Sequence, residues 1–257
     1  MSAEFQVKQF ELAEQEALLR FLQSAYPDEP RKSDRAFWKW HYLENPNTDL
    51  RDIPLWIVKS GNNVVGQMGT IPVELKAGDS TTRALWILDF IVDARFRGQG
   101  LGRRLVLAAR EKYSTLITLG INAQSTAVFN KLNWSALGRI HRYQKLLFPG
   151  HDLPGKSSWK LAEKAVNLLF TPFRPGTLRL EPRPGTDIHV LDHFDESFEG
   201  LWHDARRQWP VAVKRRPKFL EWQFFRQPGK KFEALGLKQA GRWEGYAVLY
   251  FRTPRRG

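Results

Sequence analysis

The stretch Trp86–Tyr113 constrains the fold of this chain more than any other part of the sequence. It begins with an apolar run, residues 86–92, which has the length of a buried strand and is too short to cross a bilayer. A turn with three glycines at alternate positions follows, Gly98, Gly100 and Gly102, and a helical pattern then starts. A strand, turn and helix of this kind predict an anion-binding site. The first N–H groups of a helix lack internal partners, and the helix dipole is positive there.

The residue types in this turn suit a phosphate. Glycine lets the backbone approach a ligand closely, and Arg97 and Arg103 add charge-assisted donors. The turn is not a G-x-G-x-x-G dinucleotide motif in register, and it lacks the Gly-Lys-Ser/Thr of a P-loop. Taken alone it is weak evidence, since many helices begin near a glycine.

The segment Arg97-x-x-Gly100-x-Gly102 after an apolar strand resembles the pyrophosphate-binding motif of the GNAT acyl-CoA N-acyltransferases. The resemblance implies that the N–H groups of the turn hold the pyrophosphate of coenzyme A and that the preceding strand pairs with the pantetheine arm. Acetyl-CoA is the implied cosubstrate. The implied coenzyme-binding residues in this stretch are Ile91, Val92, Arg97, Gly98, Gln99, Gly100, Leu101, Gly102 and Arg103.

A second block fits the same resemblance. After an apolar run at 116–121 the sequence reads Asn122-x-x-Ser125-x-x-x-Phe129-x-Lys131-Leu132-x-Trp134, which has the family's spacing and implies that Asn122 and Phe129 lie beside the coenzyme. Asn133 replaces the usual glycine, a mild change because asparagine tolerates a left-handed backbone. Phe129 replaces the usual tyrosine, whose hydroxyl protonates the leaving thiolate in many members, and phenylalanine has no proton to give.

The implied reaction moves an acyl group, usually acetyl, from CoA to a primary amine. It needs a base for the amine proton and a donor for the thioester oxygen, which N–H groups near Ile91 and Val92 could supply. Asp89 is the candidate base, with a pKa raised by burial; the alternative is a carboxylate in solvent or in an ion pair with an arginine. Tyr143 is the candidate acid, unless it is a core or surface tyrosine, a water serves, or the thiolate leaves unprotonated.

Composition excludes several classes of protein. With no cysteine there are no disulfides, thiolate metal sites or cysteine nucleophiles, and the sequence carries no carboxylate–histidine metal cluster, so we expect no metal. No apolar run is long enough for a membrane span. The polar, acidic start differs from a secretory signal, so we expect a cytoplasmic protein.

The order of predicted elements indicates an α/β fold with a mixed sheet, and the resemblance makes this a GNAT-like fold. We expect a GNAT-like acetyltransferase domain at 1–150, a connector with one helix (157–170) at 151–186, and a partial second GNAT-like domain at 187–257. The elements predicted in the first domain are strands at 4–10, 54–58, 64–69, 71–75, 86–92, 116–121 and 136–147, with helices at 13–25, 35–43, the segment after Gly102 and the segment after Asn122.

The second domain is predicted from an internal repeat. Phe37-x-x-Trp40-x-Tyr42-x-x-x-Pro46 recurs as Phe219-x-x-Trp222-x-Phe224-x-x-x-Pro228. Lys59 and Gly66 recur as Lys238 and Gly245, and Phe5-x-Val7 with its following helix recurs as Ile188-x-Val190 with a helix at 196–207. The repeat indicates two related domains. The second lacks a counterpart of the glycine turn, and its half-sheet is expected to pack on the first domain or on a partner.

Charge supports an alternative function. The chain carries a net charge of +13, of which residues 1–134 contribute +2 and residues 135–257 contribute +11. A basic surface attracts anionic partners, although most charged faces are simply solvated. The main hypothesis is an N-acyltransferase acting on a small amine, an amino sugar or a lipid-linked precursor. The alternative is a non-catalytic module that binds acyl-CoA or docks on an anionic partner.

Overall fold

The computed structural model describes residues 4–138 and 184–250 of the chain. The candidate acid Tyr143, most of the predicted strand 136–147 and the predicted helix 157–170 lie outside these ranges.

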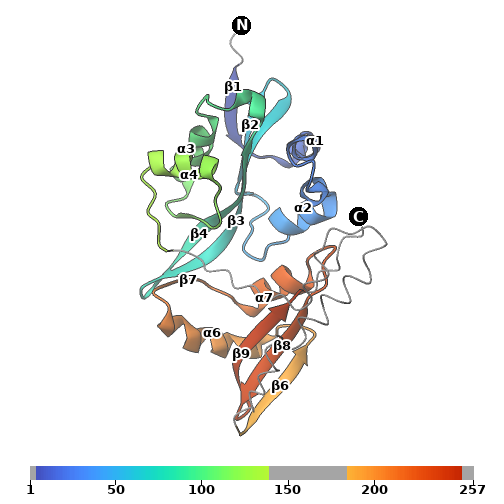
Figure 1. Ribbon diagram of the computed structural model, residues 1–257, viewed down its shortest axis with the longest axis vertical. Coiled ribbons are helices and arrows are strands. Elements are labelled where there is room, and N and C mark those ends of the chain that lie inside the picture. The colour runs from blue at the N-terminus through green and yellow to red at the C-terminus, as the bar shows by residue number, and fades with distance from the viewer. Residues whose placement is uncertain (1–3, 139–183, 251–257) are drawn as a thin grey trace, which may run out of the picture.

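A mixed six-stranded sheet forms the first unit (Figure 1), which confirms the predicted α/β class. Its strands run in the order β1-β2-β3-β4-β5, and β4 and β5 are parallel while the other neighbours are antiparallel. A short strand from the C-terminal half, β7 (Val211–Val213), extends the sheet by pairing with the end of β3. The remaining strands are β1 (Phe5–Gln9), β2 (Leu55–Ser60), β3 (Asn63–Ala77), β4 (Ser80–Val92) and β5 (Leu116–Thr118).

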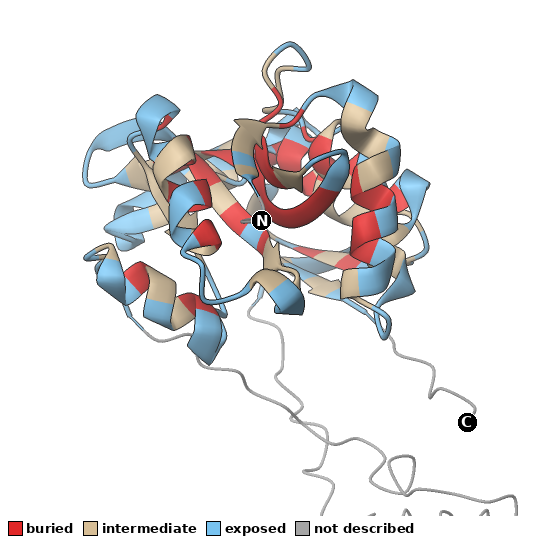
Figure 2. Cartoon of the chain, turned by 90° about the horizontal axis from the view of Figure 1, so that it is seen from above, coloured by how far each residue is buried: buried red, intermediate tan, exposed pale blue. Residues whose placement is uncertain are grey.

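Helices cover both faces of this sheet (Figure 1). On one face α1 (Gln15–Ala25) and α2 (Arg35–Tyr42) enclose a core that is rich in aromatic rings, among them the fully buried Trp38. On the other face α3 (Leu101–Lys112) and α4 (Ala123–Lys131) enclose a second core. Figure 2 shows the buried residues gathered along the sheet and the inner faces of these helices.

Two departures from the predicted strands shape the site. β4 is longer than expected because it begins at Ser80, whereas β5 is shorter because it ends at Thr118; Leu119 and Ile121, predicted to be buried, are 52% and 41% exposed. β5 therefore pairs only with residues 85–87 of β4. The rest of β4 has β3 on one side and no strand of the described chain on the other.

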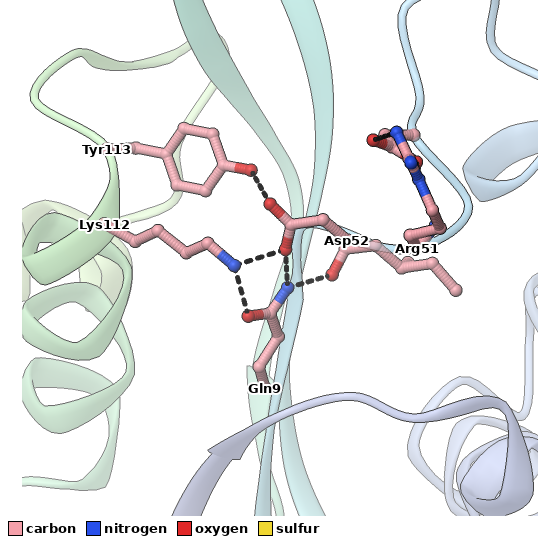
Figure 3. Close-up of polar contacts among 7 residues, drawn as sticks. Gln9, Arg51, Asp52, Lys112 and Tyr113 are labelled. Atoms are coloured by element: carbon pink, nitrogen blue, oxygen red, sulfur yellow. Dashed lines mark hydrogen bonds and ion pairs between the residues drawn. The ribbon is translucent and has the colours of Figure 1, made fainter.

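The C-terminal end of α3 is tied to the sheet by Asp52, in the loop before β2 (Figure 3). Its carboxylate accepts hydrogen bonds from Nε2 of Gln9 at 2.7 Å and from the hydroxyl of Tyr113 at 3.1 Å, and it pairs with the ammonium of Lys112. Burial raises the pKa of the Asp52 carboxyl, but these partners outweigh that effect and hold the pKa below its usual value. The network fixes one end of α3 and so helps to orient the glycine turn at the other end.

The C-terminal unit has a three-stranded sheet in the order β6-β8-β9, with bounds β6 (Thr186–Leu191), β8 (Glu233–Gln239) and β9 (Arg242–Leu249). Its register repeats that of β1-β2-β3. Val58 pairs with Gly66 and a bulge follows before Lys59; Leu237 pairs with Gly245 and a bulge follows before Lys238. The predicted match of the first strands is wrong by two residues, since Val7 lies opposite Val58 and it is Ile188, not Val190, that lies opposite Leu237.

One face of this small sheet is covered and the other is open. The covering elements are α6 (Glu199–Ala205), α7 (Pro217–Leu220) and a π-helical turn at Glu221–Phe225; they and the strands bury Phe194, Phe198, Leu220 and Ala234. On the opposite face Ile188 and Val190 are 65% and 81% exposed, and no described element covers them. The positions equivalent to this face in the first unit lie under α3.

Candidate functional site

The glycine turn adopts the conformation that its sequence predicts. Gly98 and Gly100 have φ angles of +80° and +74°, a left-handed region in which only glycine is unstrained, and Gly100 is the N-cap of α3. Apart from the glycine itself and its two neighbours in the chain, no described atom lies within 4 Å of the position a Cβ would take at either glycine, so a ligand can come close to this backbone. Gly102 is needed for packing instead, because a Cβ there would lie 3.1 Å from the Phe90 ring.

Contrary to the prediction from the sequence, not all of the side chains around the turn are positioned to contact an anion. Nε of Arg97 donates to the carbonyl of Val92 at 3.0 Å, which braces the turn against the end of β4. Gln99 and Arg103 are exposed, and Leu101 is buried in the core beneath α3, so it can offer only its backbone. The N–H groups at the start of α3 are therefore the main candidates for binding an anion.

The open edge of β4 is formed by Phe90 and Val92 rather than by Ile91. The N–H of Asp93 donates to the carbonyl of Val65, so that pair is hydrogen bonded, and the groups of Ile91, two residues earlier, also face β3. The main-chain groups of Phe90 and Val92 face away from β3, on the side where β5 has ended. Of the two residues predicted to pair with the pantetheine arm, Val92 has its main-chain groups at the open edge, whereas those of Ile91 face β3.

Asp89 is a buried carboxylate, 5% exposed, on the face of β4 that carries α1 and α2. A bulge puts it there: Gly69 pairs with Asp89 and Thr70 with Ile87, so Leu88 is an extra residue that resets the alternation of side chains. One oxygen of Asp89 accepts from the hydroxyl of Tyr42 at 2.6 Å, and the other pairs with the ammonium of Lys32.

The predicted rise in the pKa of Asp89 is wrong. Burial does raise the pKa, but the charge of Lys32 and the hydrogen bonds from Lys32 and Tyr42 outweigh it, and the pKa lies below its usual value. Asp89 is therefore ionised at neutral pH. The alternative prediction, an ion pair with an arginine, is confirmed as to the ion pair and wrong as to the partner, which is Lys32.

Sequence reasoning missed both partners of Asp89, Lys32 and Tyr42, and also missed the two residues that surround the Tyr42 hydroxyl, Gln67 and Gly69. Tyr42 is completely packed, and burial together with the neighbouring carboxylate raises its pKa far above the ordinary value, so it remains a hydrogen-bond donor. Nε2 of Gln67 donates to the Tyr42 oxygen at 3.2 Å. Gly69 makes room for this contact, because a Cβ there would overlap the Tyr42 hydroxyl and lie 2.7 Å from Nε2 of Gln67. The sequence signals these residues only through the internal repeat, in which Tyr42 aligns with Phe224.

The second predicted block has mainly structural roles. Asn122 caps α4, and its Oδ1 accepts from the N–H of Ser125 at 2.8 Å. Asn133 has φ +56°, the left-handed conformation expected at a position where the family has glycine. Phe129 is 2% exposed and packs on Trp134 and Phe90, with ring centres 4.4 Å and 5.6 Å apart. The Phe129 ring therefore packs against Phe90, one of the two residues that form the open edge of β4.

Other features lie away from these residues. A hollow of about 380 Å³ is lined by α1, the β2–β3 hairpin and the residues just before the glycine turn, Asp93, Arg95 and Phe96; Asp89 and residues 97–102 do not line it. Within residues 4–138 and 184–250, no cluster of His, Asp and Glu could hold a metal ion, and no helix is long and apolar enough to cross a membrane.

The fold and the glycine turn are those of a GNAT-type domain. Residues 15–134 match the profile of the acetyltransferase (GNAT) family, and this part of the chain belongs to that family. No curated protein sequence matches the chain.

Comparison with solved structures gives the same fold at low sequence identity. A probable N-acyltransferase of Enterococcus faecalis aligns with a TM-score of 0.60 at 13% identity, over 97% of this chain and 56% of its own. A GCN5-related N-acetyltransferase from Anabaena variabilis gives 0.60 at 12%, over 99% and 56%. The N-myristoyltransferase of Saccharomyces cerevisiae with bound myristoyl-CoA gives 0.55 at 12%, over 97% and 61%. The likeness shows the fold, and this chain spans slightly more than half of the first two proteins.

Proposed function

We propose that this chain is an acyl-CoA N-acyltransferase that moves an acyl group, with acetyl-CoA as the first candidate donor, to a primary amine. The observation that best supports this is the construction of β4. Its open edge and the glycine turn after it can receive the coenzyme, while the same strand carries the buried, ionised Asp89 on its other face. The proposed coenzyme site and the candidate base are thus both carried by β4.

On the donor side, the N–H groups at the start of α3 bind the pyrophosphate. The main-chain groups of Phe90 and the N–H of Val92 pair with the pantetheine arm, since the carbonyl of Val92 already accepts a hydrogen bond from Arg97. The left-handed Gly98 and Gly100 leave the approach open. The N-myristoyltransferase that shares the fold was solved with myristoyl-CoA, so longer acyl chains belong in any donor panel.

On the acceptor side, the amine arrives as an ammonium ion and displaces Lys32 from the Asp89 carboxylate. Asp89 takes one proton, and the freed nitrogen lone pair attacks the thioester carbon. The carbon–sulfur bond breaks, an amide forms, and the nitrogen loses its second proton to water. The sulfur leaves as thiolate and is protonated by water, because Phe129 has no proton to give.

The second candidate function is a module that binds acyl-CoA without turnover or docks on an anionic partner. Phe129 favours it, because the ring stands where the family has its usual acid and is buried between Phe90 and Trp134. The net charge of +11 on residues 135–257 supports an anionic partner.

Release of free CoA thiol from acetyl-CoA and myristoyl-CoA, measured with a panel of primary amines, tests the proposal. Amine-dependent release that Asp89→Asn lowers about 100-fold supports the enzyme. Saturable acyl-CoA binding with no release from any amine, followed by release from Phe129→Tyr, supports the module instead.

A further inference from the structure

The side chain of Arg31 is half-buried and makes no ion pair or hydrogen bond with the described residues. Its guanidinium carbon lies 4.0 Å from the centre of the Phe37 ring, and burial lowers its pKa. By contrast, the guanidinium of Arg35, four residues later, forms an ion pair with the carboxylate of Glu16. A guanidinium stacked on an aromatic ring and unpaired along its edge keeps its N–H donors available for a carboxylate or phosphate.

The place of Arg31 ties it to the candidate base. It precedes Lys32 in a 3-10 turn, Pro30–Ser33, and Lys32 is the residue that pairs with Asp89. Three groups act electrostatically on the guanidinium of Arg31: Tyr250, which directly follows β9, acts most strongly, followed by the carboxylates of Glu29 and Asp89. The guanidinium therefore lies within electrostatic range of both the candidate base and the C-terminal unit.

His41 is a second, independent sign of a binding site in this region. Both of its ring nitrogens are inaccessible and have no hydrogen-bond partner among the described residues, although a neutral imidazole has one donor and one acceptor to satisfy. Burial lowers the pKa of His41 to about 4, and the charges of Asp89, Lys32 and Arg31 all act on the ring. The same cluster thus holds an unpaired guanidinium and an unpaired imidazole.

We propose that the acceptor is a primary amine that also carries an anionic group, a carboxylate or a phosphate, which Arg31 holds while the amine reaches Asp89. This rests on the proposed acyl transfer. The ammonium of such an acceptor is complementary to the Asp89 carboxylate, and its anionic group is complementary to the cations of Arg31 and Lys32. The ammonium replaces Lys32 at Asp89, and the displaced Lys32 side chain becomes a second cation for the anionic group.

Matched amines with and without the anion test this in the full chain. The pairs are 2-aminoethyl phosphate with ethanolamine, β-alanine with propylamine, and glucosamine 6-phosphate with glucosamine. Binding is measured by calorimetry with CoA present, and turnover is measured by thiol release from acetyl-CoA. At least one anionic amine is expected to bind tenfold or more tightly than its neutral partner, and the pair that responds distinguishes phosphate from carboxylate.

Variants assign the preference to the guanidinium. Arg31→Gln is expected to remove the preference and raise KM for the anionic amine at least tenfold, with acetyl-CoA affinity unchanged. Arg31→Lys retains the charge but loses the fork, so an intermediate loss is expected even if the glutamine variant folds poorly. Arg35→Gln, on the exposed part of α2, is the matched control and is expected to leave the preference unchanged.

If the folded protein binds acetyl-CoA but prefers no anionic amine, the inference is overturned and the proposed function stands. The inference is likewise overturned if Arg31→Gln folds normally and keeps the preference. Failure of the folded protein to bind any acyl-CoA would remove the proposed function, and the inference with it.

Discussion

Trp40 and Trp222 lie 182 residues apart in the chain and exchange identical hydrogen bonds. The indole N–H of each donates to the backbone carbonyl of the other at 2.8 Å, and the two rings stack with centres 4.9 Å apart at 18°. They occupy equivalent positions in the repeated motif, Phe37-x-x-Trp40 and Phe219-x-x-Trp222, and both are buried in the core under α2. The two units therefore contact each other through the same residue of the same motif, as in a local two-fold arrangement.

This contact predicts a measurable coupling between the two units. Trp40→Phe and Trp222→Phe each leave a buried carbonyl without its donor, so each is expected to cost about 1–3 kcal/mol of unfolding free energy. The double variant is expected to cost less than the sum, with a coupling of about 0.5–1.5 kcal/mol. Denaturant unfolding of the four proteins measures this, with the 58%-exposed Trp209→Phe as control. Strict additivity would show that the units do not depend on this contact.

His41 predicts an acid-sensitive stability. Its pKa is near 4 in the folded state and 6.5 when exposed, so between these values the unfolded chain binds a proton that the folded chain does not. Stability is therefore lost as the pH falls from 6.5 towards 4, by roughly 3 kcal/mol at most from this residue. The unfolding free energy of His41→Phe, followed against pH, is expected to fall less steeply than that of the wild type. The exposed His203→Phe is the control, and parallel curves for wild type and His41→Phe would contradict the prediction.

Lys32 predicts the pH dependence of catalysis. Its charge opposes the effect of burial on Asp89, so Lys32→Met is expected to raise the pKa of that carboxyl. A base with a higher pKa is protonated at higher pH, and the acid limb of the kcat/KM profile is expected to move upwards. Lys39→Met, which removes an exposed lysine paired with Glu44, provides the comparison. An unmoved acid limb would mean that Asp89 is not the titrating base.

Gly69 predicts a steric requirement at the same carboxylate. In Gly69→Ala the new methyl group overlaps the Tyr42 hydroxyl, which is expected to cost about 1–3 kcal/mol of stability and to weaken the Tyr42–Asp89 hydrogen bond. Thermal unfolding and kcat are expected to fall together. Gly200→Ala places a methyl group in open space within α6 and is expected to be neutral or slightly stabilising. Equal behaviour of the two variants would show that Gly69 has no special steric role.

The sequence predicted the parts of the fold that depend on interactions between residues close in the chain. The glycine turn, the helix that begins at its end and the helix that follows Asn122 are set by residues close in sequence, and they appear where expected. The ends of β4 and β5 were missed because strand length depends on which neighbour is present to pair, which the residues of a single strand do not encode.

The geometry around Asp89 could not be predicted from the sequence. Tyr42 and Lys32 lie 47 and 57 residues away, and only the folded sheet brings them to the carboxylate. The Leu88 bulge also moves Asp89 to the opposite face from the one that simple alternation gives. A single carboxylate in an apolar run indicated a candidate base, whereas its pKa was set by partners that the run does not contain.

Calorimetric titration with acetyl-CoA tests most directly the claim that the turn after β4 is a coenzyme site. The wild type is expected to bind with a saturable isotherm, and Gly100→Asp is expected to abolish it, because the new carboxylate repels phosphate at the helix N-terminus. Gly78→Asp is the matched control, since Gly78 also has a left-handed φ, +60°, but lies at the far turn between β3 and β4. Binding lost in Gly100→Asp and kept in Gly78→Asp supports the coenzyme site. Equal binding by all three folded proteins, or by none, would contradict it.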